Sequence, residues 1–243
     1  MGRHGTIANR KASQDAKRGQ IFTKYARLIT VAAKSGGDPD YNIELKNAID
    51  KAKSINMPND NINRAIKKGT GELEGETYES ISYEGYGPGG VAIIVETLTD
   101  NKNRTSSQMK HYFDRHNGNL GVPGCVTYMF ERKGYFLIEK TEKTSEESLM
   151  EAALEAGMED MATHEDSFEI YSSTDDYVSV KSALKDAGFE LLEADIELIP
   201  NTTTAPSSEG ELKSLSKLIN ALEENDDVQK VYHNCSENLY EDE

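Results

Sequence analysis

The chain has 243 residues, of which 36% are hydrophobic and 29% are charged, with two cysteines and no tryptophan. This composition is typical of a globular protein and excludes the collagen-like, disordered and membrane-embedded classes. The formal net charge of −16 is unevenly distributed, because residues 1–70 hold 14 Lys and Arg against 6 Asp and Glu, whereas residues 71–243 hold 13 against 37. A basic amino-terminal part followed by an acidic remainder predicts that the amino-terminal part binds a polyanion and that the remainder is soluble.

Apolar residues at helical spacing predict three helices in the basic part. The first helix spans residues 13–35, and the second restarts after a Gly-Gly-Asp-Pro break and runs from Leu45 to about Ile55. A third, short helix begins at Pro58 and ends at the Lys-Lys-Gly of residues 67–69. The segment 69–77 is rich in glycine and glutamate and indicates a linker.

The acidic remainder alternates strand and helix patterns. Short apolar or alternating runs predict strands, and 3.6-residue periods predict helices. Strands are expected at 81–84, 91–95, 126–130, 135–139, 192–199 and 228–232, a hairpin at 161–171, and helices at 103–116, 145–156, 175–187 and 211–222. From residue 135 to residue 199 the order is βαββαβ, which is typical of a ferredoxin-like sandwich.

We therefore predict an α+β protein with a three-helix amino-terminal domain followed by two α/β sandwich domains, one inserted in the other. A second linker, rich in Pro, Ser and Thr, spans residues 200–210 and leaves a helix and a strand that cannot form a domain alone. The simplest arrangement is that this helix and strand complete the incomplete sheet of residues 78–132, so that the middle domain is discontinuous. The predicted domains are residues 1–75, residues 78–132 plus 207–238, and residues 133–200.

The stretch Gly85-Tyr86-Gly87-Pro88-Gly89-Gly90 matches the GxGxxG dinucleotide fingerprint and follows a strand. A nucleotide-binding enzyme is thus one alternative. The next element is predicted to be a strand, whereas a pyrophosphate site needs the amino terminus of a helix. We prefer to interpret the motif as a glycine-rich hairpin turn.

The other reactive side chains form no recognisable catalytic or metal-binding pattern. The five histidines are scattered, and the nearest pair, His111 and His116, would lie about 140° apart on a helix. Cys125 and Cys235 have no CxxC neighbour, and this usage fits a reducing cytoplasm. We assign no catalytic residue, no metal ligand and no cofactor, and we predict a protein that is not an enzyme.

The basic side chains are the strongest functional candidates, because their charge is one-signed and spans an arm and three helices. The alternative is a solvated helical face. The predicted nucleic-acid contacts are Arg3, Arg10, Lys11, Lys17, Arg18, Lys24, Arg27, Lys34, Lys67, Lys68 and Arg104. For the Asp100 to Thr105 loop, which holds Arg104, helix capping by Asn101 or Asn103 is an equal alternative.

Several short motifs are spread over nearly the full chain: Arg10-Lys11-Ala12, Asn56-Met57-Pro58, residues 65–69 (AIKKG), residues 83–90 (YEGYGPGG) and residues 97–105 (TLTDNKNRT). They resemble those of the YebC family. Family members commonly begin with Gly-His-Ser-Lys-Trp, whereas this chain begins Met-Gly-Arg-His-Gly-Thr, so no role of that tryptophan is transferred.

The resemblance implies a three-domain cytoplasmic protein that binds DNA as a probable transcriptional regulator. Relatives of this kind also act in translation, so an RNA-contacting, ribosome-associated factor that relieves stalling is the alternative. The expected partners are DNA, ribosomal RNA or both, with a ribosomal or other protein partner on the acidic domains and no membrane. The sequence leaves the choice between DNA and RNA open.

Overall fold

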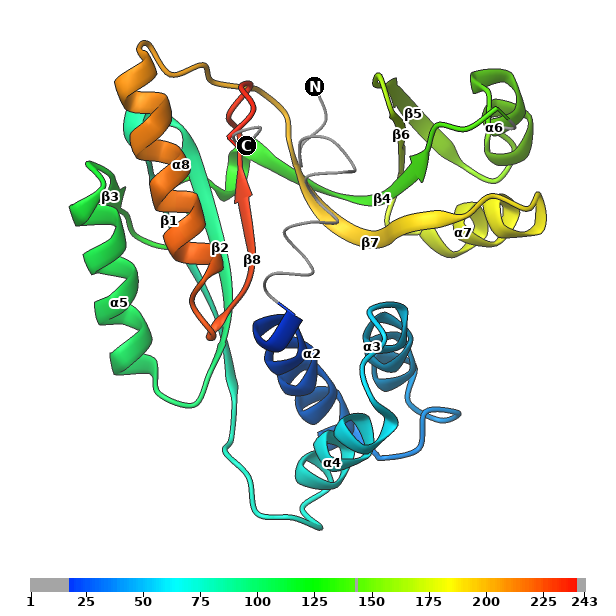
Figure 1. Cartoon of the computed structure of the whole chain (residues 1–243), viewed down its shortest axis with the longest axis horizontal. Helices are drawn as coiled ribbons and strands as arrows, with labels where there is room; N and C mark the ends of the chain where they lie inside the picture. The colour runs from blue at the N-terminus through cyan, green and yellow to red at the C-terminus, as the bar shows by residue number, and fades with distance from the viewer. Residues whose placement is uncertain (1–17, 143, 240–243) are drawn as a thin grey trace.

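The computed structural model describes residues 18–142 and 144–239 (Figure 1). Its first elements are the helices α2 (Arg18–Ala32), α3 (Ile43–Ser54) and α4 (Asn59–Gly69), and α2 continues into a 3-10 turn, Ala33–Ser35. These helices enclose a hydrophobic cluster built only from their own residues and the connections between them. The three predicted helices are confirmed, except that the start of the first, residues 13–17, lies outside the described residues.

Two local features fix the packing of the three helices. The Asn42 side chain caps α3 by accepting from the Leu45 amide, and its own amide donates to the Ala32 carbonyl at 2.7 Å. At Gly69 the backbone of α4 passes so close to α2 that a Cβ would collide with the Thr30 carbonyl oxygen. Glycine at this position therefore lets α2 and α4 pack tightly side by side.

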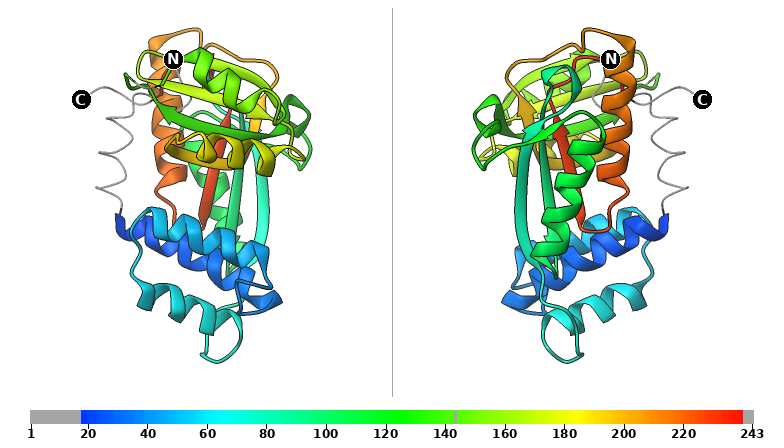
Figure 2. Two further views of the ribbon diagram at one scale, coloured as in Figure 1. Left: turned by 90° about the vertical axis from the view of Figure 1, so that its right-hand side faces the viewer. Right: turned by 90° about the vertical axis from the view of Figure 1, so that its left-hand side faces the viewer.

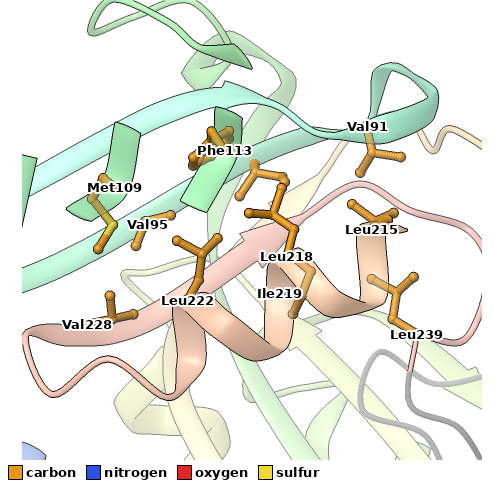
Figure 3. Packing of buried hydrophobic residues seen from close by; sticks show 11 residues of the cluster. Val91, Val95, Met109, Phe113, Leu215, Leu218, Ile219, Leu222, Val228 and Leu239 are labelled. Carbon is orange, nitrogen blue, oxygen red and sulfur yellow. The ribbon is translucent and has the colours of Figure 1, made fainter. Parts of the chain in front are cut away.

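The first sheet has the strand order β3-β1-β2-β8 and is antiparallel. Its strands are β1 (Glu79–Tyr86), β2 (Ala92–Thr99), β3 (Asn119–Leu120) and β8 (Val228–His233). The helices α5 (Lys102–Arg115) and α8 (Glu209–Glu223) cover one face, where leucines of α8 meet Met109 and Phe113 of α5 (Figure 3). The last helix and strand of the chain thus complete a sheet that its earlier residues begin.

The apolar run at β2 is buried on both faces of this sheet. Val91, Ile93 and Val95 belong to the cluster under α5 and α8, whereas Ala92 and Ile94 belong to a cluster that includes residues of the second sheet. A continuous apolar run, in place of an alternating one, is expected for a strand covered on both sides.

The second sheet has the order β5-β6-β4-β7 and is also antiparallel. Its elements follow the chain as β4 (Phe130–Glu139), α6 (Glu146–Ala153), β5 (Met158–Thr163), β6 (Ser167–Ser172), α7 (Tyr177–Asp186) and β7 (Leu191–Pro200). Residues of α6 and α7 share one core cluster with the sheet. This βαββαβ arrangement confirms the predicted α+β class with two sheet sandwiches. The exact domain limits proposed from the sequence stay a prediction.

The predicted strand at residues 126–130 is wrong. Residues Thr127–Met129 form a 3-10 turn, and the strand begins only at Phe130. The buried Glu84 carboxylate accepts the backbone amides of Gly124, Val126 and Thr127 at 2.8 to 3.0 Å. Burial raises the pKa of Glu84, but these hydrogen bonds outweigh it and the net shift is downward. The amides bound to Glu84 cannot also pair in a sheet ladder.

In the glycine-rich stretch, residues 85–86 end β1 and residues 87–90 connect it to the antiparallel strand β2. The connection forms a 3-10 turn over Pro88–Gly90, with positive φ at Gly89 (73°) and Gly90 (74°), and β2 follows directly. The element that follows the turn in the chain is a strand and not a helix, so the dinucleotide interpretation does not fit and the hairpin turn is confirmed. Within the described ranges, no helix is long and apolar enough to cross a membrane.

Candidate nucleic-acid interface

Four basic side chains lie on α4 and on the 3-10 turn that follows α2. Arg64, Lys67 and Lys68 lie on α4 at spacings of three and one, and Lys34 lies at the end of α2, next to Ala33, which meets Gly69 of α4. We call Lys34, Arg64, Lys67 and Lys68 the α4 surface. Figure 2 shows α4 at the edge of the molecule away from the two sheets.

The α4 surface is largely free of acidic partners. Lys34, Arg64 and Lys67 are exposed and Lys68 is half-buried. Among the described residues, no carboxylate forms an ion pair with any of the four, and Lys34 makes one long hydrogen bond to the Tyr78 carbonyl oxygen, at 3.4 Å. The α4 surface therefore presents positive charge to solvent.

The polar side chains on the inner side of α2, the cations Lys24 and Arg27 and the neutral Gln20, form intramolecular hydrogen bonds. Lys24 donates to the Glu223 carbonyl oxygen at 2.7 Å, and Gln20 donates weakly to the Glu224 carbonyl oxygen at 3.5 Å. Arg27 Nη1 reaches the carbonyl oxygens of Leu98 and Asp226 at 2.9 and 2.8 Å. This side of α2 is thus held against the acidic turn between α8 and β8, residues 223–227.

Asp227 is the centre of that contact. Its carboxylate, whose side chain is only 5% exposed, binds Arg27 at 2.7 Å and Arg104 at 2.9 Å. The hydroxyl of Thr105 donates to it at 2.7 Å. Burial raises the pKa of Asp227, but the hydrogen bonds from Arg104, Thr105 and Arg27 outweigh it and lower the pKa overall. One carboxylate therefore ties the first helix of the helical domain to α5 and β8.

A second polar contact joins the helical domain to the second sheet. Lys51 of α3 binds Asp195 of β7 at 2.7 Å, and Lys230 of β8 binds both Asp195 and Glu197. Burial favours neutral Asp195, but the two lysines lower its pKa overall. Burial likewise works against the Lys230 ammonium, yet Asp195 and Glu197 raise the pKa of that group. The three parts of the chain are thus connected by ion pairs.

A cleft of about 460 Å³ lies where these three parts meet. Its described lining includes the carboxylates Glu96, Glu193, Asp195, Glu197 and Glu223 and the cations Lys24, Lys51, Arg132 and Lys230. Lys51, Arg132 and Lys230 are paired with these carboxylates, so the cleft offers little free positive charge to a phosphate polymer. In the part of the chain that the structure describes, no group of three or more His, Cys, Asp or Glu could hold a metal ion.

The predicted contact residues therefore fall into three groups. Lys34, Lys67 and Lys68 lie on the outward surface, whereas Lys24, Arg27 and Arg104 lie in intramolecular contacts. Arg3, Arg10, Lys11 and Lys17, and the side chain of Arg18, lie outside the described residues. The sequence interpretation of α2 as an open cationic stripe missed that the acidic turn at residues 223–227 covers part of it.

In the Asp100 to Thr105 loop, the structure shows helix capping by Asn101, one of the two roles considered from the sequence. The Asn101 side chain accepts from the Arg104 amide at 3.1 Å and caps α5. The guanidinium of Arg104 binds Asp100 at 2.6 Å in addition to Asp227. The loop thus has a structural role in joining α5 to β8.

Sequence reasoning also missed Arg64 and Tyr78. Arg64 lies three and four positions before Lys67 and Lys68 on α4, a spacing that would have placed it with them. Tyr78 follows the linker, and no periodicity marks it. The structure places its ring 5.2 Å from the Arg27 guanidinium carbon.

Comparisons with known proteins agree with this architecture. Residues 3–72 match the model of the TACO1/YebC protein N-terminal domain, and residues 78–235 match that of the TACO1/YebC second and third domain. The chain is 58% identical to a probable transcriptional regulatory protein of Clostridioides difficile, over 96% of this chain and 98% of the relative. It is 54% identical to one of Persephonella marina, over 94% and 92%.

A solved structure gives the same result for the fold. The crystal structure of a conserved hypothetical protein from Aquifex aeolicus superposes with a TM-score of 0.84 at 46% identity, covering 96% of this chain and 94% of that one. The helical domain, the two antiparallel sheets and the matched ranges together identify the chain as a member of the TACO1/YebC family.

Proposed function

We propose that this protein is a cytoplasmic, nucleic-acid-binding regulator of transcription that is not an enzyme, and that its helical domain contacts the phosphate backbone. Its relatives are named probable transcriptional regulatory proteins, which supports the regulatory part of the proposal. The observation that carries the binding part is the α4 surface, where four cations of one sign stand without a carboxylate partner among the described residues. Such a surface attracts phosphates and releases their counterions.

The charge distribution supports the same orientation. Residues 71–243 hold 37 Asp and Glu against 13 Lys and Arg, so the sheet domains repel a polyanion. The helical domain would then face the nucleic acid, while the acidic sheet domains would stay free for a protein partner. Arg3, Arg10, Lys11, Lys17 and Arg18 are proposed to add phosphate contacts from the start of the chain.

Direct binding tests this proposal. The full chain is titrated into a fluorescein-labelled duplex of about 20 base pairs and into single-stranded DNA and RNA of the same sequence, over a salt series. We expect the logarithm of the affinity to fall linearly with the logarithm of the salt concentration. Absence of binding to all three polymers at low salt would refute the proposal.

The second candidate is a ribosome-associated, RNA-contacting translation factor. The observation that favours it is the position of two aromatic rings, Phe22 and Tyr78, in the same groove as basic side chains, because aromatic rings stack with unpaired bases. Crosslinking in cells, followed by sequencing of both DNA and RNA, separates the two functions. Enrichment of promoter DNA supports transcription, and enrichment of ribosomal RNA without promoter peaks supports translation.

A further inference from the structure

A groove of about 420 Å³ lies between α2 and α4, within the roughly 300–1,000 Å³ range of small-ligand sites. Helical spacing places the lining residues on facing sides of the two helices. Thr23, Arg27 and Thr30 share one face of α2, and Arg64 and Lys68 lie one turn apart on α4. The close approach of the two helices at Gly69 fixes its width at one end.

The lining of this groove has the charge that an anion requires. Arg64 and Lys68 contribute positive charge that has no carboxylate partner among the described residues, whereas the charge of Arg27 is balanced by Asp227. None of the described lining residues is acidic. The central cleft between the three domains, by contrast, has five carboxylates in its lining, and three of its four cations, Lys51, Arg132 and Lys230, are paired with them. Of the two hollows, only the α2–α4 groove suits a phosphate.

Arg27 retains unused hydrogen-bonding capacity in this groove. All three of its bonds to the sheet domains leave from Nη1. Its Nε is buried and has no hydrogen-bond acceptor among the described residues. This donor is costly to leave unpaired, but it lies below the surface of the groove, so the phosphate contacts are left to Arg64 and Lys68.

The groove also holds aromatic rings. Phe22 of α2 and Tyr78 both line it, and the Tyr78 ring is held over the Arg27 guanidinium with 5.2 Å between the guanidinium carbon and the ring centroid. Cations beside aromatic rings are the combination with which proteins bind unpaired nucleotides, because the phosphate meets the cation and the base stacks on the ring.

We propose that the α2–α4 groove binds one unpaired nucleotide of a single-stranded nucleic acid, with its phosphate at Arg64 and Lys68 and its base against the aromatic rings. This inference rests on the proposed function and names the part of the polymer that the helical domain recognises. The chemistry is shared by single-stranded DNA and RNA, so both are used as probes.

The test is fluorescence anisotropy of the full chain with labelled oligo(dT) and oligo(rU) of about 12 nucleotides and with a matched duplex. The variant Tyr78→Leu removes the ring, and Tyr78→Phe keeps it. We expect Tyr78→Leu to weaken binding of single strands at least about fivefold, with duplex binding changed less than about twofold and Tyr78→Phe close to the parent. Equal loss on single strands and duplex would overturn the proposal.

The phosphate part is tested by Arg64→Glu/Lys68→Glu against a matched control, Lys46→Glu/Lys53→Glu, which reverses two exposed lysines of α3. The groove variant should lower the salt slope for single strands by about 0.7, because one phosphate contact is lost, and the α3 variant should change it by less than half as much. Equal effects of the two variants, while the parent still binds, would refute the groove but leave the proposed function standing. A parent chain that binds no polymer would refute both.

A photocrosslink gives a readout that does not depend on stability. Oligonucleotides that carry 4-thiouridine or 4-thiothymidine should crosslink to peptides containing Phe22 or Tyr78, as mapped by mass spectrometry. Stronger crosslinking of one sugar type would identify RNA or DNA as the preferred source. Crosslinks confined to the sheet domains would contradict the proposal.

Discussion

The inner side of α2 and the outer side of α4 contain the same kinds of residues in the same helical domain, but they face different surroundings. Lys24 and Arg27 of α2 reach the acidic turn 223–227, and Arg27 is only 13% exposed in its side chain. Arg64 and Lys67 of α4 are exposed and have no ion pair with another described residue. Charge alone therefore does not mark a phosphate contact, because the partner that the fold supplies decides which cations remain available.

This comparison predicts that the two sides respond to different experiments. The α2 contact should control how the helical domain is held to the sheets, and the α4 surface should control binding. Reversing the charge of Arg27 should lower stability, because it would place two carboxylates together at Asp227 in a buried site.

Removal of the shared carboxylate should have the largest effect on stability. Asp227→Ala removes the carboxylate that pairs with both Arg27 and Arg104, and breaking a buried pair on one side costs about 3–5 kcal/mol. Urea unfolding followed by circular dichroism measures the change. The control is Asp226→Ala, whose exposed side chain is lost while its backbone carbonyl still accepts from Arg27. Equal effects of the two variants would show that Asp227 is not the centre of the contact.

Acid should weaken the same contact. The pKa of Asp227 is lowered in the folded state, so its contribution is complete at pH values above the ordinary aspartate pKa of about 3.9 and is lost as the pH falls through the folded value. The stability difference between the parent and Asp227→Asn should therefore be constant from neutral pH to about pH 5 and shrink below about pH 4. Unfolding curves across this range measure it, and a difference that grows in acid would contradict the assignment.

Charge reversal on the outer side should change binding and leave stability nearly unchanged. Lys34→Glu/Lys67→Glu should lower the salt slope by about 1.4 on single strands, since each lost phosphate contact removes about 0.7. The unfolding free energy should change by less than about 0.5 kcal/mol, because both side chains are exposed. An unchanged salt slope together with a large loss of unfolding free energy would contradict this prediction, because it would show that the two lysines hold the fold and do not bind phosphate.

The smallest effect is expected at the cap of α5. Asn101→Ala removes the side-chain acceptor of the Arg104 amide and should cost about 1 kcal/mol. The control is Asn103→Ala, two residues later in the chain. Its side chain is exposed, so the substitution should cost less than about 0.5 kcal/mol. If both variants leave stability unchanged but weaken nucleic-acid binding, the loop is a contact and not only a cap.

Much of the fold could be predicted because local patterns are consistent with it. Helical spacing located α2 to α4, and the order of strands and helices located the βαββαβ unit. The strand predicted at 126–130 was wrong because its amides are bound by Glu84, some 40 residues earlier in the chain. No local pattern contains that information.

The candidate site was less predictable for the same reason. Lys24 and Arg27 look like any other cations in the sequence, and their partners lie about 200 residues later, in the turn at 223–227. Tyr78 lies beside Arg27 only after the linker has folded back along the helical domain. Long-range pairing of this kind becomes visible only in the tertiary structure.

The most direct test of the central claim is hydrogen–deuterium exchange of the full chain with and without single-stranded nucleic acid. We predict that binding slows exchange in residues 59–69, which form α4, and leaves exchange in the acidic turn 223–227 unchanged. Faster exchange at 223–227 with no change in α4 would contradict it, because that result would mean that the polymer displaces the turn and binds the inner side of α2.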